Sequence, residues 1–176
     1  MPLQNLSERI RAVPDFPKKG IMFRDITTLL KDAPSFRATV DELYERYRNK
    51  EIQKVVCIEA RGFVLGAPLA YLLGAGFVPV RKPGKLPAAT RRESYALEYG
   101  TDAIEMHEDA LRPGERVLMH DDLLATGGTM AAACRLVEHA GARIIGVSFL
   151  IELSFLKGRG LLSAYDVQSL VQYDIE

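Results

Sequence analysis

Residues 116–141 combine a short apolar run, two adjacent acids, a loop of small residues and an amphipathic helix. The apolar run ends at Asp121 and Asp122, and the segment from Leu123 to Thr129 reads L-L-A-T-G-G-T. After this loop, apolar residues recur at helical spacing until Gly141, which stands where a helix C-cap belongs. The order of strand, Gly-rich loop and helix predicts an α/β protein.

The Gly-rich loop has the composition of an anion-binding site. Its glycines let backbone N–H groups approach a phosphate, its two threonines add hydroxyl donors, and the helix N-terminus adds partial positive charge. The two acids cannot bind that phosphate, so they must face hydroxyl donors or a cation, and a ribose ring beside a phosphate offers both. The P-loop and dinucleotide-binding patterns, G-x-x-x-x-G-K-[ST] and G-x-G-x-x-G, are absent. A surface turn is the alternative, but two carboxylates ending a buried strand would be costly there.

Strands and helices alternate along the rest of the chain, which predicts a mostly parallel central sheet flanked by helices. Helices are predicted over Leu3–Val13, from Asp32 as the cap to about Asn49, and over Val64–Leu73. Strands are predicted over Lys54–Glu59, Phe77–Arg81, Ser94–Tyr99, Ala103–His107, Arg143–Leu153 and Val167–Tyr173. Loops are predicted over Pro14–Gly20, Lys82–Arg92 and Leu156–Leu162. Ligands of such sheets bind at the carboxyl ends of the strands, where both the acidic pair and Glu59-Ala60-Arg61 are expected.

Composition limits the partners that the chain can have. A length of 176 residues fits one domain, and 23 basic residues balance 23 acidic ones, so no net field favours nucleic acid or an anionic membrane. The two cysteines have no metal-site spacing, and no signal peptide is evident, so we expect a reduced cytoplasmic protein. The uncharged stretch from Gly62 to Val80 is near the length of a membrane span, but its glycines and prolines favour a buried helix followed by a strand.

Four cations are candidates for phosphate binding. Arg61 lies at a strand-to-helix turn, where its guanidinium suits a bidentate phosphate contact, or else an ion pair with a neighbouring acid such as Glu59. Arg81, Lys82 and Lys85 place three cations in five residues, which could neutralise a leaving polyanion. Taken alone, such a charge run is more often a solvated turn.

Other side chains remain ambiguous from the residues alone. Glu98 could be brought onto a substrate nitrogen as a base, or it could lie on the polar face of a hairpin strand. Phe23 could stack on a flat base, although a core phenylalanine is the ordinary interpretation. His120 precedes the acidic pair but points away from Asp121 in a strand, which indicates a structural role.

Several segments resemble the adenine phosphoribosyltransferases, a branch of the type I phosphoribosyltransferase family, along nearly the full chain. In order, they are G-I-M-F-R-D-I-T-T-L-L-K-D, E-A-R-G-F, R-K-P-G-K-L-P, S-Y-A-L-E-Y-G, D-D-L-L-A-T-G-G-T and S-F-L-K-G-R. The acidic-pair segment resembles the phosphoribosyl-pyrophosphate (PRPP) motif of the whole type I family, whereas F-R-D-I and S-Y-A-L-E-Y-G point to adenine. His120 and a basic pair in the loop, Arg91-Arg92, depart from the pattern.

The resemblance implies a type I phosphoribosyltransferase fold in a single domain over residues 1–176, with an N-terminal hood over 1–33 and a flexible β-hairpin loop. It implies that Asp121 and Asp122 hold the ribose hydroxyls. The 5′-phosphate would lie on Ala125, Thr126, Gly127, Gly128 and Thr129. Pyrophosphate would meet Arg61, Arg81, Lys82 and Lys85, and adenine would meet Met22, Phe23 and Arg24. Arg61 and Glu98 would act in catalysis, and Tyr99 would lie on the flexible loop.

The implied reaction is purine salvage: adenine and PRPP give AMP and pyrophosphate. The resemblance implies Mg²⁺ bound mainly through PRPP, pyrophosphate and water, with no protein metal ligands, and a cytoplasmic homodimer that binds neither nucleic acid nor membrane. Two alternatives remain open. One is a transferase for hypoxanthine, xanthine or orotate, and the other is a non-catalytic PRPP-binding regulator.

Overall fold

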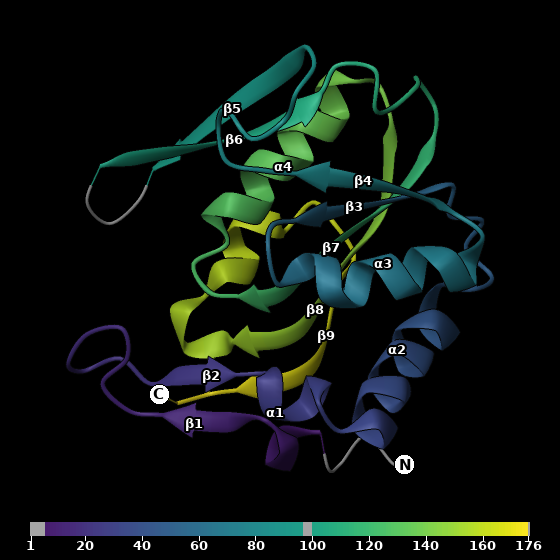
Figure 1. Cartoon of the computed structure of the whole chain (residues 1–176). Coiled ribbons are helices and arrows are strands. Elements are labelled where there is room, and N and C mark those ends of the chain that lie inside the picture. Colours follow the sequence, from purple (N-terminus) through teal and green to yellow (C-terminus); the bar gives the residue numbers. More distant parts are fainter. Residues whose placement is uncertain (1–5, 97–99, 176) are drawn as a thin grey trace.

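Five parallel strands form the central sheet of the computed structural model, which describes residues 6–96 and 100–175 (Figure 1). Their order across the sheet is β4 (Gly76–Val80), β3 (Lys54–Ile58), β7 (Arg116–Leu124), β8 (Arg143–Leu153) and β9 (Val167–Tyr173). The inner strands read as continuous apolar runs because both faces of a parallel sheet are covered. The predicted parallel sheet is confirmed.

Helices cover the two faces of the sheet. The helices α2 (Ala33–Tyr47) and α3 (Gly62–Leu73) lie on one face, and α4 (Gly128–His139) lies on the other (Figure 1). Alternate strand residues point to opposite faces, so Val55 and Cys57 pack in the core with α2 and α3, whereas Val56 and Ile58 pack in the core with α4. Asp32 caps α2 as predicted, with its side chain accepting from the Ser35 backbone N–H.

A small N-terminal layer lies at the end of the sheet that carries the strand carboxyl ends (Figure 1). It contains the 3₁₀ turn η2 (Ser7–Arg9), the antiparallel strands β1 (Arg11–Val13) and β2 (Phe23–Asp25), and the short helix α1 (Thr27–Leu30). The predicted helix over Leu3–Val13 is therefore wrong for residues 11–13, which form β1, and within the described residues 6–13 helical structure is limited to the short 3₁₀ turn η2. Pairing of β1 with β2 and the Arg11–Asp25 ion pair override the local helical pattern.

The predicted hairpin is confirmed as β5 (Thr90–Ala96) paired antiparallel with β6 (Thr101–His107). β5 begins earlier than expected, so Arg91 and Arg92 are strand residues and not loop residues. Both are held there by side-chain contacts: Arg91 donates to the His139 carbonyl, and Arg92 forms an ion pair with Glu105.

The strand that carries the acidic pair is longer than predicted. β7 continues through Leu123 and Leu124, which pair with Ile151 and Glu152 of the longer β8. The loop is therefore reduced to residues 125–127, and α4 begins at Gly128. The 3₁₀ turns η3 (Ser154–Leu156) and η4 (Gly158–Leu162) then connect β8 to β9.

The uncharged stretch from Gly62 to Val80 forms α3 and β4, as predicted, with a left-handed turn at Gly74 between them. No helix within residues 6–96 and 100–175 is both long enough and apolar enough to span a membrane.

Close packing of α3 on β3 depends on one glycine. An ideal Cβ on Gly66 would lie 2.1 Å from the Cys57 Sγ atom, so Gly66→Ala must displace the buried Cys57 side chain, the helix or the strand. Such overpacking costs about 1–3 kcal/mol, more than alanine gains in helix propensity, and we expect urea unfolding to show that loss. The double variant Cys57→Ala/Gly66→Ala removes the colliding sulfur and should recover part of it. Wild-type stability of Gly66→Ala would contradict this packing.

Candidate active site

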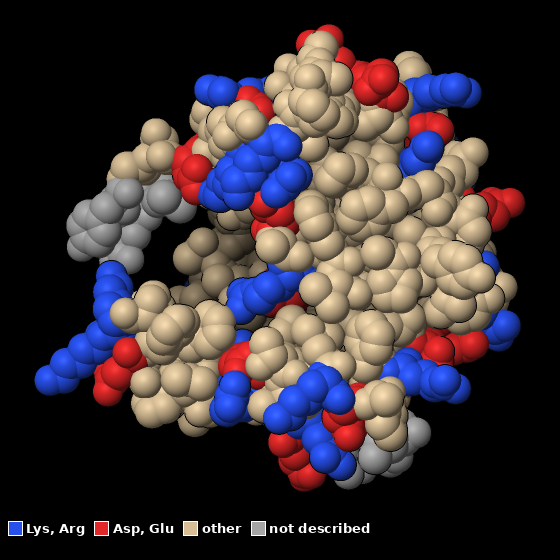
Figure 2. All heavy atoms as spheres, viewed as in Figure 1, with Lys and Arg blue, Asp and Glu red and all other residues tan. Residues whose placement is uncertain are grey.

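The predicted site residues of β3 and β7 meet at the carboxyl ends of these neighbouring strands. A cavity of about 220 Å³ opens there, lined by the turn after β3, the acidic pair of β7, Lys82, Tyr95 and Thr129. We call this the central cavity. Figure 2 shows the surface hollowed between the hairpin and the N-terminal layer, with Lys and Arg side chains along the margin of the hollow.

Asp121 and Asp122 occupy the floor of the central cavity. Burial, reinforced by the charge of Asp122, raises the pKa of Asp121 well above its usual value, and burial raises the pKa of Asp122 despite the opposing Arg61 charge. Asp121 Oδ1 accepts from the Asp122 backbone N–H at 2.8 Å, whereas the contact of the buried Asp122 Oδ2 is an ion pair with Arg61 that lacks hydrogen-bond geometry. The pair therefore offers acceptor capacity that hydroxyl donors of a ligand would satisfy.

Arg61 joins two parts of the site. Its Nε atom lies 2.9 Å from Asp122 Oδ2, so Arg61 does form an ion pair with a nearby acid, which is Asp122 and not Glu59. Its guanidinium carbon lies 5.2 Å from the centre of the Phe23 ring. The side chain is 40% exposed and lines both the central cavity and an apolar cavity beside it, so it can reach a ligand from either.

The loop between β7 and α4 surrounds a third cavity of about 80 Å³, which also borders Asp121. Ala125, Thr126, Gly127 and Thr129 line it, as the sequence predicts for a phosphate site. Gly127 has a φ of +85°, a left-handed conformation that glycine adopts at no steric cost. The N-terminus of the twelve-residue helix α4 follows at once, so backbone N–H groups and the helix dipole both favour an anion here.

The three cations after β4 are held by acids. Arg81 and Lys85 both form ion pairs with Glu59, at 3.1 and 3.2 Å, and Lys82 pairs with Asp102 and contacts the Tyr95 hydroxyl. Of the three, Lys82 lines the central cavity. The sequence did not predict that Glu59 would pair with Arg81 and Lys85, although its position after a buried strand parallels that of the acidic pair.

An apolar cavity of about 340 Å³ adjoins Arg61 and is lined by the N-terminal layer. Phe23 contributes one wall, with Phe16 packed edge-on at 5.0 Å between ring centres. Met22 lines a separate cavity with Pro14, Asp15, Gly20 and Ile21, and the Arg24 guanidinium lies over the Tyr173 ring at 4.0 Å. Of the three predicted base-binding residues, Phe23 is therefore the one that shares a cavity with Arg61.

Glu98 and Tyr99 lie outside the described residues, so their predicted roles stay predictions. His120 is fully buried and its Nδ1 atom lies 2.8 Å from Ser148 Oγ. Burial lowers the pKa of His120 to about 4, which keeps the ring neutral and agrees with the predicted structural role. Among residues 6–96 and 100–175, no group of three His, Cys, Asp or Glu side chains could hold a metal ion.

Comparisons with known proteins agree with this geometry. Residues 27–171 match the sequence profile of the phosphoribosyl transferase domain. Adenine phosphoribosyltransferase of Clostridium perfringens is 57% identical over 171 residues, covering 97% of this chain and 99% of the relative. The corresponding protein of Desulfitobacterium hafniense is 59% identical over 164 residues, with 93% and 95% coverage.

Solved structures show the same relationship. The crystal structure of adenine phosphoribosyltransferase from Thermoanaerobacter pseudethanolicus superposes with a TM-score of 0.94 at 52% identity, covering 97% of this chain and 99% of that one. The Saccharomyces cerevisiae enzyme, solved with an imino-altritol bisphosphate and adenine, gives 0.90 at 40% identity, covering 96% and 97%. This chain belongs to the adenine phosphoribosyltransferase family, with a type I phosphoribosyltransferase fold.

Proposed function

We propose that this chain transfers the 5-phosphoribosyl group of PRPP to adenine, giving AMP and pyrophosphate in purine salvage. The observation that carries the proposal is the sequence of three adjoining cavities. The cavity at the loop between β7 and α4, which we call the phosphate cavity, shares Asp121 with the central cavity. The central cavity shares Arg61 with the apolar cavity. A 5-phosphoribosyl group with a base at C1 requires this order of anion site, hydroxyl-binding acids and flat apolar site.

The proposed roles follow the surroundings of each residue. Asp121 and Asp122 accept hydrogen bonds from the ribose hydroxyls, and residues 125–129 hold the 5′-phosphate. Arg61 and Lys82 face the central cavity and bind the leaving pyrophosphate. Arg81 and Lys85, which Glu59 holds, complete its charge environment.

The base enters the apolar cavity, where Phe23 offers a ring face, and Met22 and Arg24 support this part of the pocket from either side of Phe23 in the chain. As pyrophosphate leaves, positive charge develops at C1 of the ribose and adenine N9 attacks the opposite face. The protein positions the reactants, stabilises the charges and excludes water that would hydrolyse PRPP. We propose Glu98 as the base that takes the N9 proton and Tyr99 as part of the closing loop.

Mg²⁺ is proposed to enter on the phosphates of PRPP and to leave with pyrophosphate. The residues fit such a substrate-borne ion, because Asp121 and Asp122 line the central cavity and their carboxylate oxygens can accept from water around the ion. When bound, the ion neutralises charge on the leaving pyrophosphate.

We also propose that the chain works as a homodimer in the cytoplasm, as one phosphoribosyltransferase domain whose residues 1–33 form the hood. Large apolar side chains are exposed on α3 and β4, among them Tyr71 at 84%, Val64, Leu72 and Phe77. Figure 2 shows a broad surface with few charged atoms in this region. Exposed apolar patches of this kind mark protein interfaces, and small-molecule substrates require no nucleic-acid or membrane surface.

Turnover with different bases tests the proposed function. Purified protein with PRPP and Mg²⁺ should release pyrophosphate with adenine, and kcat/KM with hypoxanthine should be lower by a factor of roughly 10⁴. The physical reason is that a site built to pair with the 6-amino group leaves buried polar groups unpaired against a carbonyl. Equal rates with hypoxanthine would move the protein to another base, and binding of PRPP without turnover of any base would indicate a regulator.

The acidic pair is tested by the double variant Asp121→Asn/Asp122→Asn. Loss of two charged acceptors, each worth about 1.5–3 kcal/mol, should lower kcat/KM for PRPP by about 10²–10⁴-fold. Asp166→Asn is the matched control, because Asp166 pairs with Lys50 beside the opposite end of β9 and should leave turnover unchanged. Normal efficiency in the double variant would contradict the ribose-binding role.

The raised pKa of Asp121 predicts how stability depends on pH. The folded state retains the Asp121 proton to higher pH than the unfolded chain does, so this group lowers the free energy of unfolding as pH rises from about 4 towards the folded-state pKa. Asp121→Asn should therefore be more stable than wild type at pH 7, with the difference shrinking as pH falls to 4. Urea unfolding of wild type and Asp121→Asn at several pH values measures this difference in stability and its dependence on pH. A variant that is less stable at pH 7 would contradict the prediction.

A further inference from the structure

The two 3₁₀ turns between β8 and β9, residues 154–162, press against the loop proposed to hold the 5′-phosphate. We call residues 154–162 the backing segment. An ideal Cβ on Gly158 would lie 2.2 Å from the Ala125 carbonyl oxygen and 3.1 Å from the Gly127 nitrogen, and one on Gly127 would lie 2.5 Å from the Gly158 carbonyl oxygen. Gly158 is buried and does not line the phosphate cavity. The two backbones therefore touch outside that cavity.

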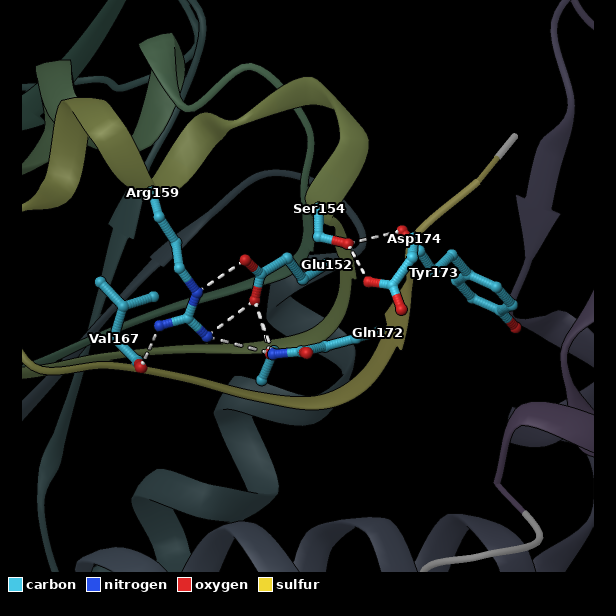
Figure 3. Close-up of polar contacts among 8 residues, drawn as sticks. Glu152, Ser154, Arg159, Val167, Gln172, Tyr173 and Asp174 are labelled. Carbon is cyan, nitrogen blue, oxygen red and sulfur yellow. Dashed lines mark hydrogen bonds and ion pairs between the residues drawn. The ribbon is translucent and has the colours of Figure 1, made fainter.

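Arg159, the next residue of the backing segment, forms an ion pair with the buried side chain of Glu152. Arg159 donates from Nε to Glu152 Oε1 at 2.6 Å and from Nη2 to Glu152 Oε2 at 2.7 Å (Figure 3). Its remaining nitrogen, Nη1, donates to the Val167 carbonyl at 2.7 Å. One guanidinium thus binds the end of β8 and the start of β9 at the same time, with the planar fork that arginine alone provides.

Glu152 is fixed from several sides. Its side chain is 4% exposed, and Oε2 also accepts from Ser169 Oγ at 2.7 Å and from Gln172 Nε2 at 3.3 Å (Figure 3). Burial favours the neutral acid, but the hydrogen bonds from Arg159 and Ser169 outweigh it and hold the pKa of Glu152 below its ordinary value. The carboxylate is a rigid, charged anchor with its acceptor capacity in use.

Ser154, the first residue of the backing segment, is anchored too. Ser154 Oγ donates to the Tyr173 carbonyl at 2.9 Å, and it lies 2.5 Å from Asp174 Oδ1 (Figure 3). Because Ser154 and Arg159 both bind backbone carbonyls of β9, side-chain contacts hold the backing segment on either side of Gly158.

We propose that Glu152 and Arg159 are positioning residues for the 5′-phosphate loop, acting through the contact of Gly158 with Ala125 and Gly127. This inference rests on the proposed function, because it assigns to the network the task of aligning N–H groups for the phosphate of PRPP and AMP. Displacement of catalytic or binding groups by about 1 Å can cost about 10²-fold, so a fixed backing for a short Gly-rich loop has a large effect on binding.

A pair of glycine variants tests the contact directly. Gly158→Ala must move the phosphate loop or the backing segment, whereas Gly160→Ala lies in the same 3₁₀ turn with nothing within 4 Å of the added Cβ. We expect calorimetry to show AMP binding about 10–100-fold weaker in Gly158→Ala and unchanged in Gly160→Ala. The cations proposed to bind pyrophosphate do not touch Gly158, so the affinity for pyrophosphate with Mg²⁺ should be unchanged in both variants.

A second series tests the ion pair. Arg159→Lys keeps the charge but cannot bind both carboxylate oxygens and the Val167 carbonyl, so AMP binding should fall between those of wild type and Arg159→Ala. Because Arg159→Ala also leaves a buried carboxylate unpaired, its loss of stability needs a control. Val40→Ala truncates the core between α2 and the sheet, far from the loop, and should lower stability without changing the affinity for AMP.

The outcomes separate this inference from the proposed function. A folded Gly158→Ala or Arg159→Lys variant with wild-type affinity for AMP overturns the inference and leaves the function intact. An equal loss of AMP and pyrophosphate affinity also overturns it, because a general loss of structure would then be the cause. Wild-type protein that binds AMP but fails to turn over adenine and PRPP refutes the proposed function without touching the positioning role.

Discussion

Acidic side chains stand at the carboxyl ends of three adjacent parallel strands, and the loops of the site depend on them. Glu59 follows β3, the acidic pair lies near the end of β7, and Glu152 lies near the end of β8. Each is paired with cations from a different loop: Arg81 and Lys85, Arg61, and Arg159. This row of carboxylates orders the cationic loops around the ligand cavities.

The acids differ in how fully they are satisfied, and that difference matches their proposed roles. Hydrogen bonds lower the pKa of both Glu59 and Glu152 against the effect of burial. Those to Glu59 come from the Lys82 backbone N–H, Arg81 and Lys85, and those to Glu152 come mainly from Arg159 and Ser169, so these two acids act as anchors. In the acidic pair burial dominates and both pKa values are raised, and the Arg61 contact with Asp122 Oδ2 does not have hydrogen-bond geometry. A buried acid that is incompletely hydrogen-bonded lowers the stability of the protein alone, and a ligand that donates hydrogen bonds to it recovers that energy on binding.

Much of the fold was predictable because its signals are local. The cap at Asp32, the apolar runs of β3 and β8, and the left-handed turn at Gly74 each follow from a few neighbouring residues. The prediction failed where pairing between distant segments decided the structure. The helix expected before Pro14 is partly replaced by strand β1, because residues 11–13 pair with residues 23–25.

The sequence by itself determined the chemistry of the site: an acidic pair, a Gly-rich loop at a helix N-terminus and a set of cations near strand ends. Those features depend on residue type and spacing, which the chain carries locally. Only the tertiary structure decided which charges meet, placing Arg61 on Asp122 and giving Glu59 to Arg81 and Lys85. It also brought Gly158 against the phosphate loop. Such pairings join residues that are far apart in the chain, so they follow from the order and register of the parallel strands.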